Sequence, residues 1–558
     1  MVVAINIRPQ KKVGPRGCPH QGNDENEGDE ESSGAHPLTA GYGFFNCQIV
    51  LEGKEWRLSQ PTSHRRPNQR LMQTTLPLLE PCPIARLSGL LMFGCAAFCC
   101  SFTTTRAQAA VHYVNSMNVS PAAPYVTWET AATNIQDAVD AGTTPGRVIV
   151  VTNGTYATGQ SSVSVRGENQ VNRIAITNGA LLKSVNGPAV TVIDGTGMRC
   201  IYLGGGAQIS GFTLANGSSI WGGAGVASDG LGIVTNCIIT NNVCPNDGHF
   251  GGGGALNTVI YNSWLVKNFT GFLPGGGAMG SELINCIVSE NEASEGGGVA
   301  ECLIRNCTVT QNQVPAIGTT FAFPTGGGAS KSTIDNCIVE FNTIEGFGDP
   351  STSNHVSCLI NYSCTGPLPA SGHGNFSADP RFVSAAGNNF RLAPNSPCIN
   401  SGLNSLAPSS TDLDGLARIV GSAVDMGAYE YLTPKSILSY AWLQKYGLPI
   451  DGSADFKDSD ADGVSNAVEW EAGTNPKDSQ SKLKLLPLSL GNSGALVTWK
   501  SVSERNYTVQ RAHALSLTQT FETISPTLPG QTNITSYLDP TPIEHGPFFY
   551  RVKVLVNE

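Results

Sequence analysis

A run of acidic residues near the carboxyl-terminal end has the spacing of a calcium-binding loop. Between 458 and 469, three aspartates, an asparagine and a glutamate are separated by small residues and one glycine. A twelve-residue calcium loop supplies oxygen ligands from positions 1, 3, 5, 7, 9 and 12, and needs glycine at position 6 for a sharp turn. Gly463 stands at that position. The ligands expected from this spacing are Asp458, Asp460, Asp462, the Val464 carbonyl, Asn466 and Glu469.

The alternative interpretation of this run is an acidic loop in contact with solvent. Gly463 and Glu469 both fall at the required offsets, which favours calcium. A helix is expected from Ala467 to Ala472, ended by Gly473, whereas 451–457 has no helical pattern. The run therefore resembles the single calcium loops of bacterial extracellular proteins and thrombospondin-type repeats more than a paired intracellular sensor. We expect it to act as a structural clamp in a linker.

Four side chains in the middle of the chain could contact a ligand. Tyr261 and Trp264 flank one corner and could stack on a sugar ring, although burial beneath an inserted loop would explain them as well. Arg305 and Asp335 occupy equivalent positions of neighbouring repeats, and a surface ion pair is the simpler explanation for them. Because no cluster of titratable residues falls on one outer face, the sequence assigns no catalytic residue.

These four residues belong to a stretch, 204–342, in which one short phrase returns six times. Its anchor position falls at steps of 25, 26, 23, 21 and 30 residues, at Phe212, Cys237, Ser263, Cys286, Cys307 and Cys337. Coils of this length, with short strands and no helical period, indicate a parallel β-helix whose coils bury one another's inner faces.

The phrase also predicts a bend in every coil. Side chains alternate along a strand, yet both Val234 and Cys237 sit at positions that stay apolar or small, so the alternation slips by one between them. The residue at the slip is Gly211 in the first copy and asparagine afterwards, the two types that most readily accept positive φ. We expect a ladder of stacked residues at Asn236, Asn262, Asn285, Asn306 and Asn336.

The cysteines of the repeat are expected to face inward. Cys237, Cys286, Cys307 and Cys337 share one position, where a free thiol behaves as a small hydrophobic group. Disulfides stay possible in an exported chain, and sequence cannot set their connectivity. The candidates are Cys358 with Cys364, or members of the set Cys200, Cys244, Cys302 and Cys398.

The phrase pattern resembles the right-handed parallel β-helix proteins, the architecture of pectate lyases and of many bacterial surface proteins. The string from Asp379 to Glu430 closely resembles the terminal coils of the bacterial choice-of-anchor proteins, whose C-termini carry interchangeable surface-attachment modules. The resemblance covers roughly 111–431. It implies an exported or cell-surface location and no particular reaction.

The expected fold class is all-β: a right-handed single-stranded parallel β-helix, then a short helical calcium-loop linker and a small β-sandwich. The β-helix is expected over 110–431, with an amino-terminal capping helix at 133–142 that begins at Thr133. The linker is expected over 432–482. The alternating strands of 483–558 resemble a fibronectin type III or immunoglobulin-like sandwich.

The amino terminus predicts export. An apolar run from Leu87 to Phe102 follows Arg86 and precedes an A-x-A site at 107–109, which is the pattern of a secretory signal peptide over 72–109. An internal buried segment is the alternative. Residues 1–71 are charged, rich in proline and without pattern, and are expected to be a disordered leader or to precede the true start of translation.

Composition excludes one class of function. With a net charge of −10, the chain lacks the basic surface that nucleic-acid binding requires. We expect an exported or cell-surface scaffold for binding or adhesion, in the secreted, surface or outer-membrane compartment, with polysaccharide or a cell-surface partner, calcium as cofactor and no transmembrane span in the mature chain. The alternative is a polysaccharide lyase or glycoside hydrolase of the pectate-lyase-like β-helix type.

Overall fold

The computed structural model describes residues 2–7, 48–50, 110–165, 167–245, 248–315, 326–345, 354–491, 493–514, 520–541 and 547–555. The signal peptide predicted over 72–109 lies outside these residues. Of the predicted leader, only β1 (Val2–Ile7) and β2 (Gln48–Val50) are described, and β1 pairs antiparallel with strand β43 (Phe548–Leu555) near the carboxyl terminus.

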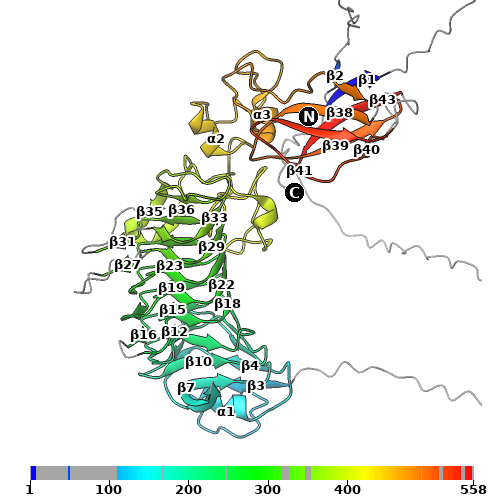
Figure 1. The fold of residues 1–558 in the computed structure, drawn as a ribbon. Helices are drawn as coiled ribbons and strands as arrows, with labels where there is room; N and C mark the ends of the chain where they lie inside the picture. Colours follow the sequence, from blue (N-terminus) through cyan, green and yellow to red (C-terminus); the bar gives the residue numbers. More distant parts are fainter. Residues whose placement is uncertain are drawn as a thin grey trace, which may run out of the picture. The chain divides into compact units, whose positions relative to one another are not determined.

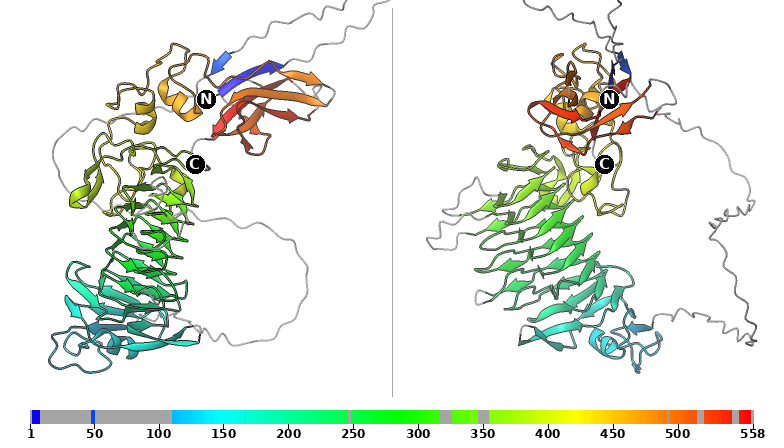
Figure 2. Two further views of the ribbon diagram at one scale, coloured as in Figure 1. Left: turned by 60° about the vertical axis from the view of Figure 1, so that its left-hand side comes forward. Right: turned by 45° about the vertical axis from the view of Figure 1, so that its right-hand side comes forward.

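The described residues between 111 and 365 form a parallel β-helix whose coils lie one above another (Figures 1 and 2). Three sheets run along it. The β3–β33 sheet contains, in spatial order, β3 (Val111–Val114), β4 (Val148–Val151), β8 (Leu181–Ser184), β11 (Gln208–Ser210), β14 (Ile233–Thr235), β18 (Val259–Tyr261), β22 (Glu282–Ile284), β25 (Leu303–Arg305), β29 (Thr333–Asp335) and β33 (Leu359–Asn361).

The other two sheets complete each coil. The β5–β34 sheet contains β5 (Gly154–Tyr156), β9 (Thr191–Asp194), β12 (Thr213–Ala215), β15 (Ile238–Thr240), β19 (Trp264–Val266), β23 (Ile287–Ser289), β26 (Thr308–Thr310), β30 (Ile338–Glu340) and β34 (Cys364–Thr365). The β6–β32 sheet contains β6 (Ser161–Val165), β7 (Glu168–Ile176), β10 (Arg199–Leu203), β13 (Val226–Ser228), β17 (Ala255–Leu256), β21 (Ala278–Met279), β24 (Val299–Ala300), β28 (Ala329–Ser330) and β32 (His355–Val356). Short pairs join β16 (Val243–Cys244) to β20 (Phe269–Thr270) and β27 (Gln313–Val314) to β31 (Thr343–Ile344).

The strand register confirms the predicted repeat. Val234 lies opposite Ile260, and Ile260 lies opposite Leu283, so equivalent residues of successive coils pair in parallel. The five predicted bend asparagines have φ values from 46° to 53°, and Gly211 has φ 84°. The bend in each coil is therefore confirmed, since these are the left-handed conformations that asparagine and glycine tolerate best.

A second asparagine ladder, which the sequence reasoning missed, runs through the core. In each coil the side-chain amide donates to the side-chain oxygen of the asparagine in the next coil, at 2.9 to 3.1 Å, through Asn242, Asn268, Asn291, Asn312, Asn342 and Asn354. All six residues are buried. The sequence does contain a signal for this ladder. Each of the first five asparagines follows one of the anchor positions from Cys237 to Cys337 by five residues.

The anchor cysteines face the core, as predicted. The backbone N–H of Cys286 donates to the Cys307 sulfur at 3.3 Å, and that of Cys307 donates to the Cys337 sulfur at 3.3 Å. The ten cysteines of the described region are free thiols, and all but the half-buried Cys358 are buried. The candidate disulfides are therefore not formed among the described residues. These side chains instead pack in the core and accept hydrogen bonds.

We expect the thiols of the chain from Ala110 to resist modification in the folded state. Burial raises the pKa of Cys200 and of Cys302 to about 12, and the thiolate is the reactive form. Titration with Ellman's reagent should find at most one reactive thiol in the native protein, Cys358, and ten after unfolding in guanidinium chloride. Fewer than ten after unfolding would show that disulfides form after all.

A capping helix closes the amino-terminal end of the β-helix. Helix α1 (Ile135–Asp140) buries Ile135, Ala138 and Val139 against the first coils, as predicted. The N-cap is Asn134 and not Thr133, because the Asn134 side chain accepts the Asp137 N–H at 2.9 Å.

After the last coil, the terminal segment (366–431) folds back over the outer surface. It contains the hairpin of β35 (Phe382–Ser384) and β36 (Asn389–Leu392), together with the 3₁₀ turns η2 (Ala385–Gly387) and η3 (Asn404–Leu406). Phe390, Ala428 and Tyr429 cluster with Ile287 of strand β23. Ile287 and Thr308 lie at outward positions of their strands, yet the terminal segment buries both, and the Ala428 N–H donates to Thr308 Oγ1 at 3.2 Å.

The linker and the sandwich follow. Helix α2 (Tyr440–Lys445) is capped by Ser439. Helix α3 (Asn466–Ala472) ends at Gly473 with φ 75°, as predicted. One antiparallel sheet contains β37 (Ser489–Gly491), β38 (Gly494–Ser501) and β42 (Asn533–Asp539); a second contains β39 (Asn506–Ala512), β40 (Glu522–Thr523), β41 (Leu528–Pro529) and β43, with β1 and β2. Their shared core includes Trp499, Tyr507 and Tyr550.

Candidate calcium loop and ligand-binding residues

The backbone of the acidic loop is held in a turn by its own carboxylates. Asp458 accepts the N–H groups of Asp462 at 3.2 Å and of Gly463 at 2.8 Å, and Asp462 accepts that of Val464 at 2.8 Å. Gly463 has φ 89°, which the sharp turn requires. Local hydrogen bonds therefore hold the loop in this turn.

The turn brings the predicted ligands together. Carboxylate oxygens of Asp458, Asp460 and Asp462 lie within 4.8 Å of one another. Asn466 and Glu469, in helix α3, are completely buried. Val464 lies between the turn and this helix, with its side chain buried. The segment 446–465 before helix α3 is irregular and contains no helix, as the absence of a helical pattern at 451–457 predicted.

Several oxygens of this cluster are buried without a hydrogen-bond partner. They are both carboxylate oxygens of Asp460, Oδ2 of Asp462, Oδ1 of Asn466 and Oε2 of Glu469. Lys482 Nζ lies 3.7 Å from Asp462 Oδ2. A buried oxygen without a hydrogen-bond partner costs about 1–3 kcal/mol, so five in one place form a donor set that a cation would satisfy. Oxygen donors of this number and type fit Ca²⁺.

Mutual repulsion adds to this cost. Burial raises the pKa of Glu469 to about 7, with further contributions from the charges of Asp460 and Asp462. Burial and the Asp462 charge also raise the pKa of Asp460. By contrast, the Gly463 N–H lowers the pKa of Asp458. A divalent cation would remove the repulsion, since it binds the ionised forms.

The loop is tied to the segments on either side of it. Asp455 accepts the Ser436 hydroxyl at 2.6 Å and the Ile437 N–H at 3.0 Å, and Asn466 donates to the Ala454 carbonyl at 2.8 Å. Asp455 is buried. These bonds join the start of the linker to helix α3.

The two predicted aromatic residues have different surroundings. Tyr261 ends strand β18 and is half-buried. Trp264 begins strand β19, and its ring lies 6.1 Å from that of Phe390 in the terminal segment. Trp264 is also half-buried and packs against the terminal segment, which agrees in part with the burial alternative, although no inserted loop covers it among the described residues.

We expect the two aromatic residues to respond differently to truncation. Trp264→Ala should reduce the free energy of unfolding by about 2–3 kcal/mol, because it leaves a cavity against Phe390. Tyr261→Ala should change it by less than about 1 kcal/mol. Urea titrations followed by circular dichroism measure both. Equal losses for the two variants would contradict the packing described for Trp264.

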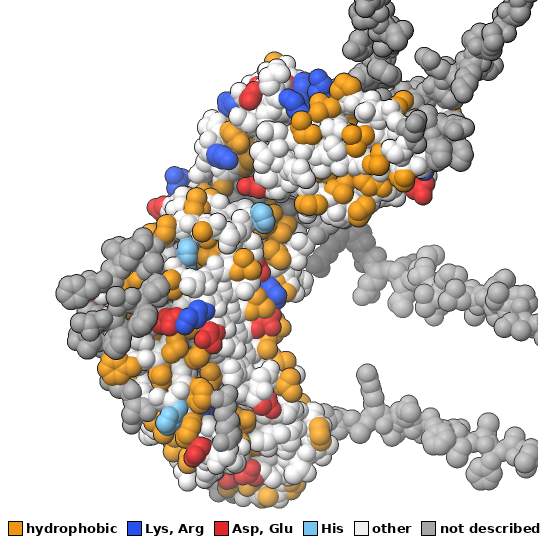
Figure 3. All heavy atoms as spheres, viewed as in Figure 1, with side chains coloured by type: hydrophobic (Ala, Val, Ile, Leu, Met, Phe, Trp, Pro, Cys, Tyr) orange, Lys and Arg blue, Asp and Glu red, His pale blue; other side chains and the backbone are white. Residues whose placement is uncertain are grey.

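The predicted charged pair belongs to a larger group. Arg305 Nη1 lies 2.8 Å from Glu282 Oε1, and Arg305 Nε lies 3.9 Å from Asp335 Oδ2. Asp335 also accepts the Asn361 amide at 3.1 Å. On the face drawn in Figure 3, acidic and basic side chains occur in small mixed groups of this kind. Sequence reasoning missed Glu282, because it starts strand β22 whereas Arg305 ends strand β25.

Glu340 is a further carboxylate at the edge of the coils. It ends strand β30 and accepts the Asn354 amide at 2.9 Å. Burial raises the pKa of Glu340 to about 7, and the nearby Asp379 charge adds to the rise. A carboxyl group of this pKa could exchange a proton at neutral pH.

No protein-family model matches the chain, and no curated protein matches it. Among solved structures, the pectin methylesterase PemA from Erwinia chrysanthemi is similar at 12% identity over 47% of this chain and 90% of that one, with a TM-score of 0.25. The pectin methylesterase from Aspergillus niger is similar at 11% identity over 56% and 98%, with a TM-score of 0.25. The tailspike protein gp49 from the Acinetobacter baumannii bacteriophage Fri1, a capsular polysaccharide depolymerase, is similar at 11% identity over 81% and 85%, with a TM-score of 0.21. Likenesses this remote support no conclusion about reaction or ligand.

Proposed function

We propose that this chain is an exported, cell-surface β-helix protein that acts as a binding or adhesion scaffold toward polysaccharide. The observation that carries the proposal is the pairing of charged side chains on the outer faces of the coils. Arg305 binds Glu282 and Asp335, and Lys331 lies 3.0 Å from Glu295. Charged groups that are paired in this way are less available for proton transfer. The pairing therefore favours a binding surface over a catalytic site.

The resemblance of 379–430 to the terminal coils of choice-of-anchor proteins supports surface attachment. In this proposal the linker and the sandwich, which resembles a fibronectin type III module, connect the β-helix to its anchor. Calcium in the acidic loop fixes the linker. Within the described residues, no helix has the length and apolar character needed to cross a membrane.

Capture experiments test the scaffold proposal. The chain from Ala110 is incubated with immobilised uronate-containing and neutral polysaccharides in calcium-containing buffer, and bound protein is quantified. We expect retention on at least one polysaccharide, with the heat-denatured chain as the control. Uniform failure to bind every polysaccharide and whole cells would contradict the scaffold proposal.

A polysaccharide lyase or glycoside hydrolase is the second candidate, and Glu340 is the observation that favours it. Its pKa of about 7 is the value expected of a general acid or base at neutral pH. If the chain cleaves polysaccharide through this group, Glu340→Gln should abolish product formation while the folded state is kept.

A further inference from the structure

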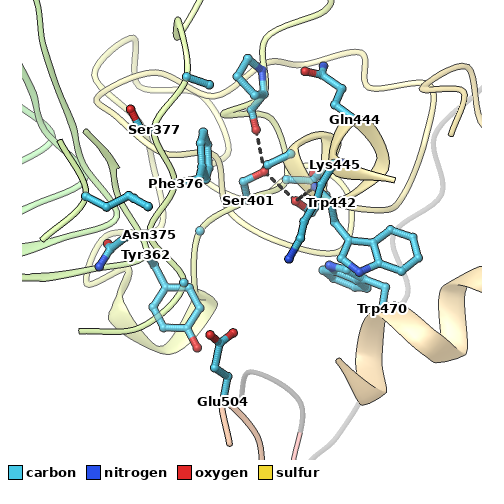
Figure 4. Close-up of a pocket in the computed structure, with 18 of the residues that line it drawn as sticks. Tyr362, Asn375, Phe376, Ser377, Ser401, Trp442, Gln444, Lys445, Trp470 and Glu504 are labelled. Carbon is cyan, nitrogen blue, oxygen red and sulfur yellow. Dashed lines mark hydrogen bonds between the residues drawn. The ribbon is translucent and has the colours of Figure 1, made fainter. Parts of the chain in front are cut away.

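The terminal part of the β-helix and the linker, together with Glu504 and Arg505 of the sandwich, line a half-open cavity of about 530 Å³ (Figure 4). Four aromatic side chains line it: Tyr362, which follows β33, Phe376 of the terminal segment, Trp442 of α2 and Trp470 of α3. All four pack against the core that the last coil shares with the linker. The volume and the aromatic lining are those of a small-molecule site.

Polar groups in the cavity wall lack protein partners. The Ser377 hydroxyl and the Glu504 carboxylate are exposed at the rim and make no hydrogen bond or ion pair with any described residue; the indole N–H groups of the half-buried Trp442 and Trp470 make none either. In Figure 4 the Glu504 carboxylate points toward Tyr362. Since none of these groups is bound to another side chain, each can form a hydrogen bond with a polar ligand in place of water.

Ser401 is a polar residue of the cavity whose hydroxyl does have protein partners. It also lines the cavity, but its hydroxyl donates to the Pro397 carbonyl at 2.7 Å and lies 2.8 Å from the Ser439 hydroxyl. Its hydrogen bonds are those of a structural group. Ser377, Glu504 and the two indole N–H groups differ from Ser401 because their side chains have no hydrogen-bond partner among the described residues.

The charges around the cavity balance. Lys445 and Arg505 oppose Glu471 and Glu504. Arg505 is already bound, because it donates to the carbonyls of Trp470 and Glu471 at 3.0 Å. An acidic sugar would thus have Lys445 as its cationic partner, but it would also be repelled by Glu504. A neutral ligand avoids this repulsion.

We propose that this cavity binds a neutral hexose ring of a polysaccharide. The apolar C–H faces of the ring would stack on the tryptophans, and its hydroxyl groups would meet Ser377, Glu504 and the indole N–H groups. This inference rests on the proposed scaffold function and names its binding site and ligand class. The site differs from the outer faces of the coils, where Tyr261 lies.

The test is isothermal titration of the chain from Ala110 with the methyl glycosides of glucose, galactose, mannose and N-acetylglucosamine. Calcium is kept in excess, because helix α3 carries both Glu469 and Trp470. We expect at least one glycoside to bind, Trp442→Ala to weaken it roughly tenfold or more, and Trp442→Phe to weaken it less. Trp128→Ala is the matched control, since Trp128 is 40% exposed in the first coil.

The outcomes separate the site from the scaffold. Absence of heat with all four glycosides overturns the proposed site, as does equal binding by Trp442→Ala and the parent chain. If polysaccharide is still captured in either case, the scaffold function stands without this site. Glycoside binding that depends on Trp442, in a chain that captures no polysaccharide, supports the site while the scaffold function fails.

Discussion

Replacing Asp460 by alanine should abolish calcium binding by this chain. Both oxygens of Asp460 are buried without a partner, between Asp458 and Asp462. The substitution removes one of the converging carboxylates that a hard cation needs. Isothermal titration of the chain from Ala110 with calcium should show one binding event for the parent and none for Asp460→Ala.

Calcium should also stabilise the linker. An ion that binds only the folded state at about 100 times its Kd adds about 2.7 kcal/mol to the free energy of unfolding. A chelator should remove this increment from the parent and have no effect on Asp460→Ala. Asp451→Ala is the matched control, because Asp451 is exposed and lies outside the loop. A parent chain that gives no heat with calcium would contradict the assignment.

The second large effect is expected in the buried asparagine ladder. Asn291→Ala should reduce the free energy of unfolding by about 3–5 kcal/mol. Asn291 donates to the Leu265 carbonyl at 2.8 Å and accepts both the backbone and the side-chain N–H of Asn268 at 3.0 Å. Removing the Asn291 side-chain amide deprives the Leu265 carbonyl and the Asn268 N–H groups of this partner. Each buried group that is left unpaired costs about 1–3 kcal/mol of stability.

Denaturant titration measures this loss, and hydrogen exchange at the Asn268 amide localises it. Asn169→Ala is the matched control: Asn169 is exposed on strand β7, and its substitution should change stability by less than about 0.5 kcal/mol. A loss below about 1 kcal/mol for Asn291→Ala would show that the ladder contributes little to the stability of the fold.

Local spacing predicted the parts of the molecule that depend on local physics. The slip at Asn236 implied a left-handed residue, and the structure has φ 50° there. The turn at Gly463 and the helix that ends at Gly473 followed from the loop pattern in the same way. In each case the conformation depends on a few neighbouring residues, so the sequence carries the information directly.

Features that depend on distant segments were not predictable. Ile287 has the pattern of an outer position, and only the return of Phe390 and Tyr429 buries it. The cavity likewise combines Tyr362, Trp442 and Trp470, from three elements with no common motif. The core asparagines were missed although their spacing is regular, because a polar residue in a coil suggests an outer position until its partners are known.

The measurement that tests the central claim most directly is one incubation that records both binding and cleavage. The chain from Ala110 is mixed with uronate-containing and neutral polysaccharides plus calcium; absorbance of unsaturated products, reducing ends and captured protein are followed together. We predict capture without new product ends. New ends above a heat-inactivated control would contradict a binding scaffold and establish a carbohydrate-active enzyme instead.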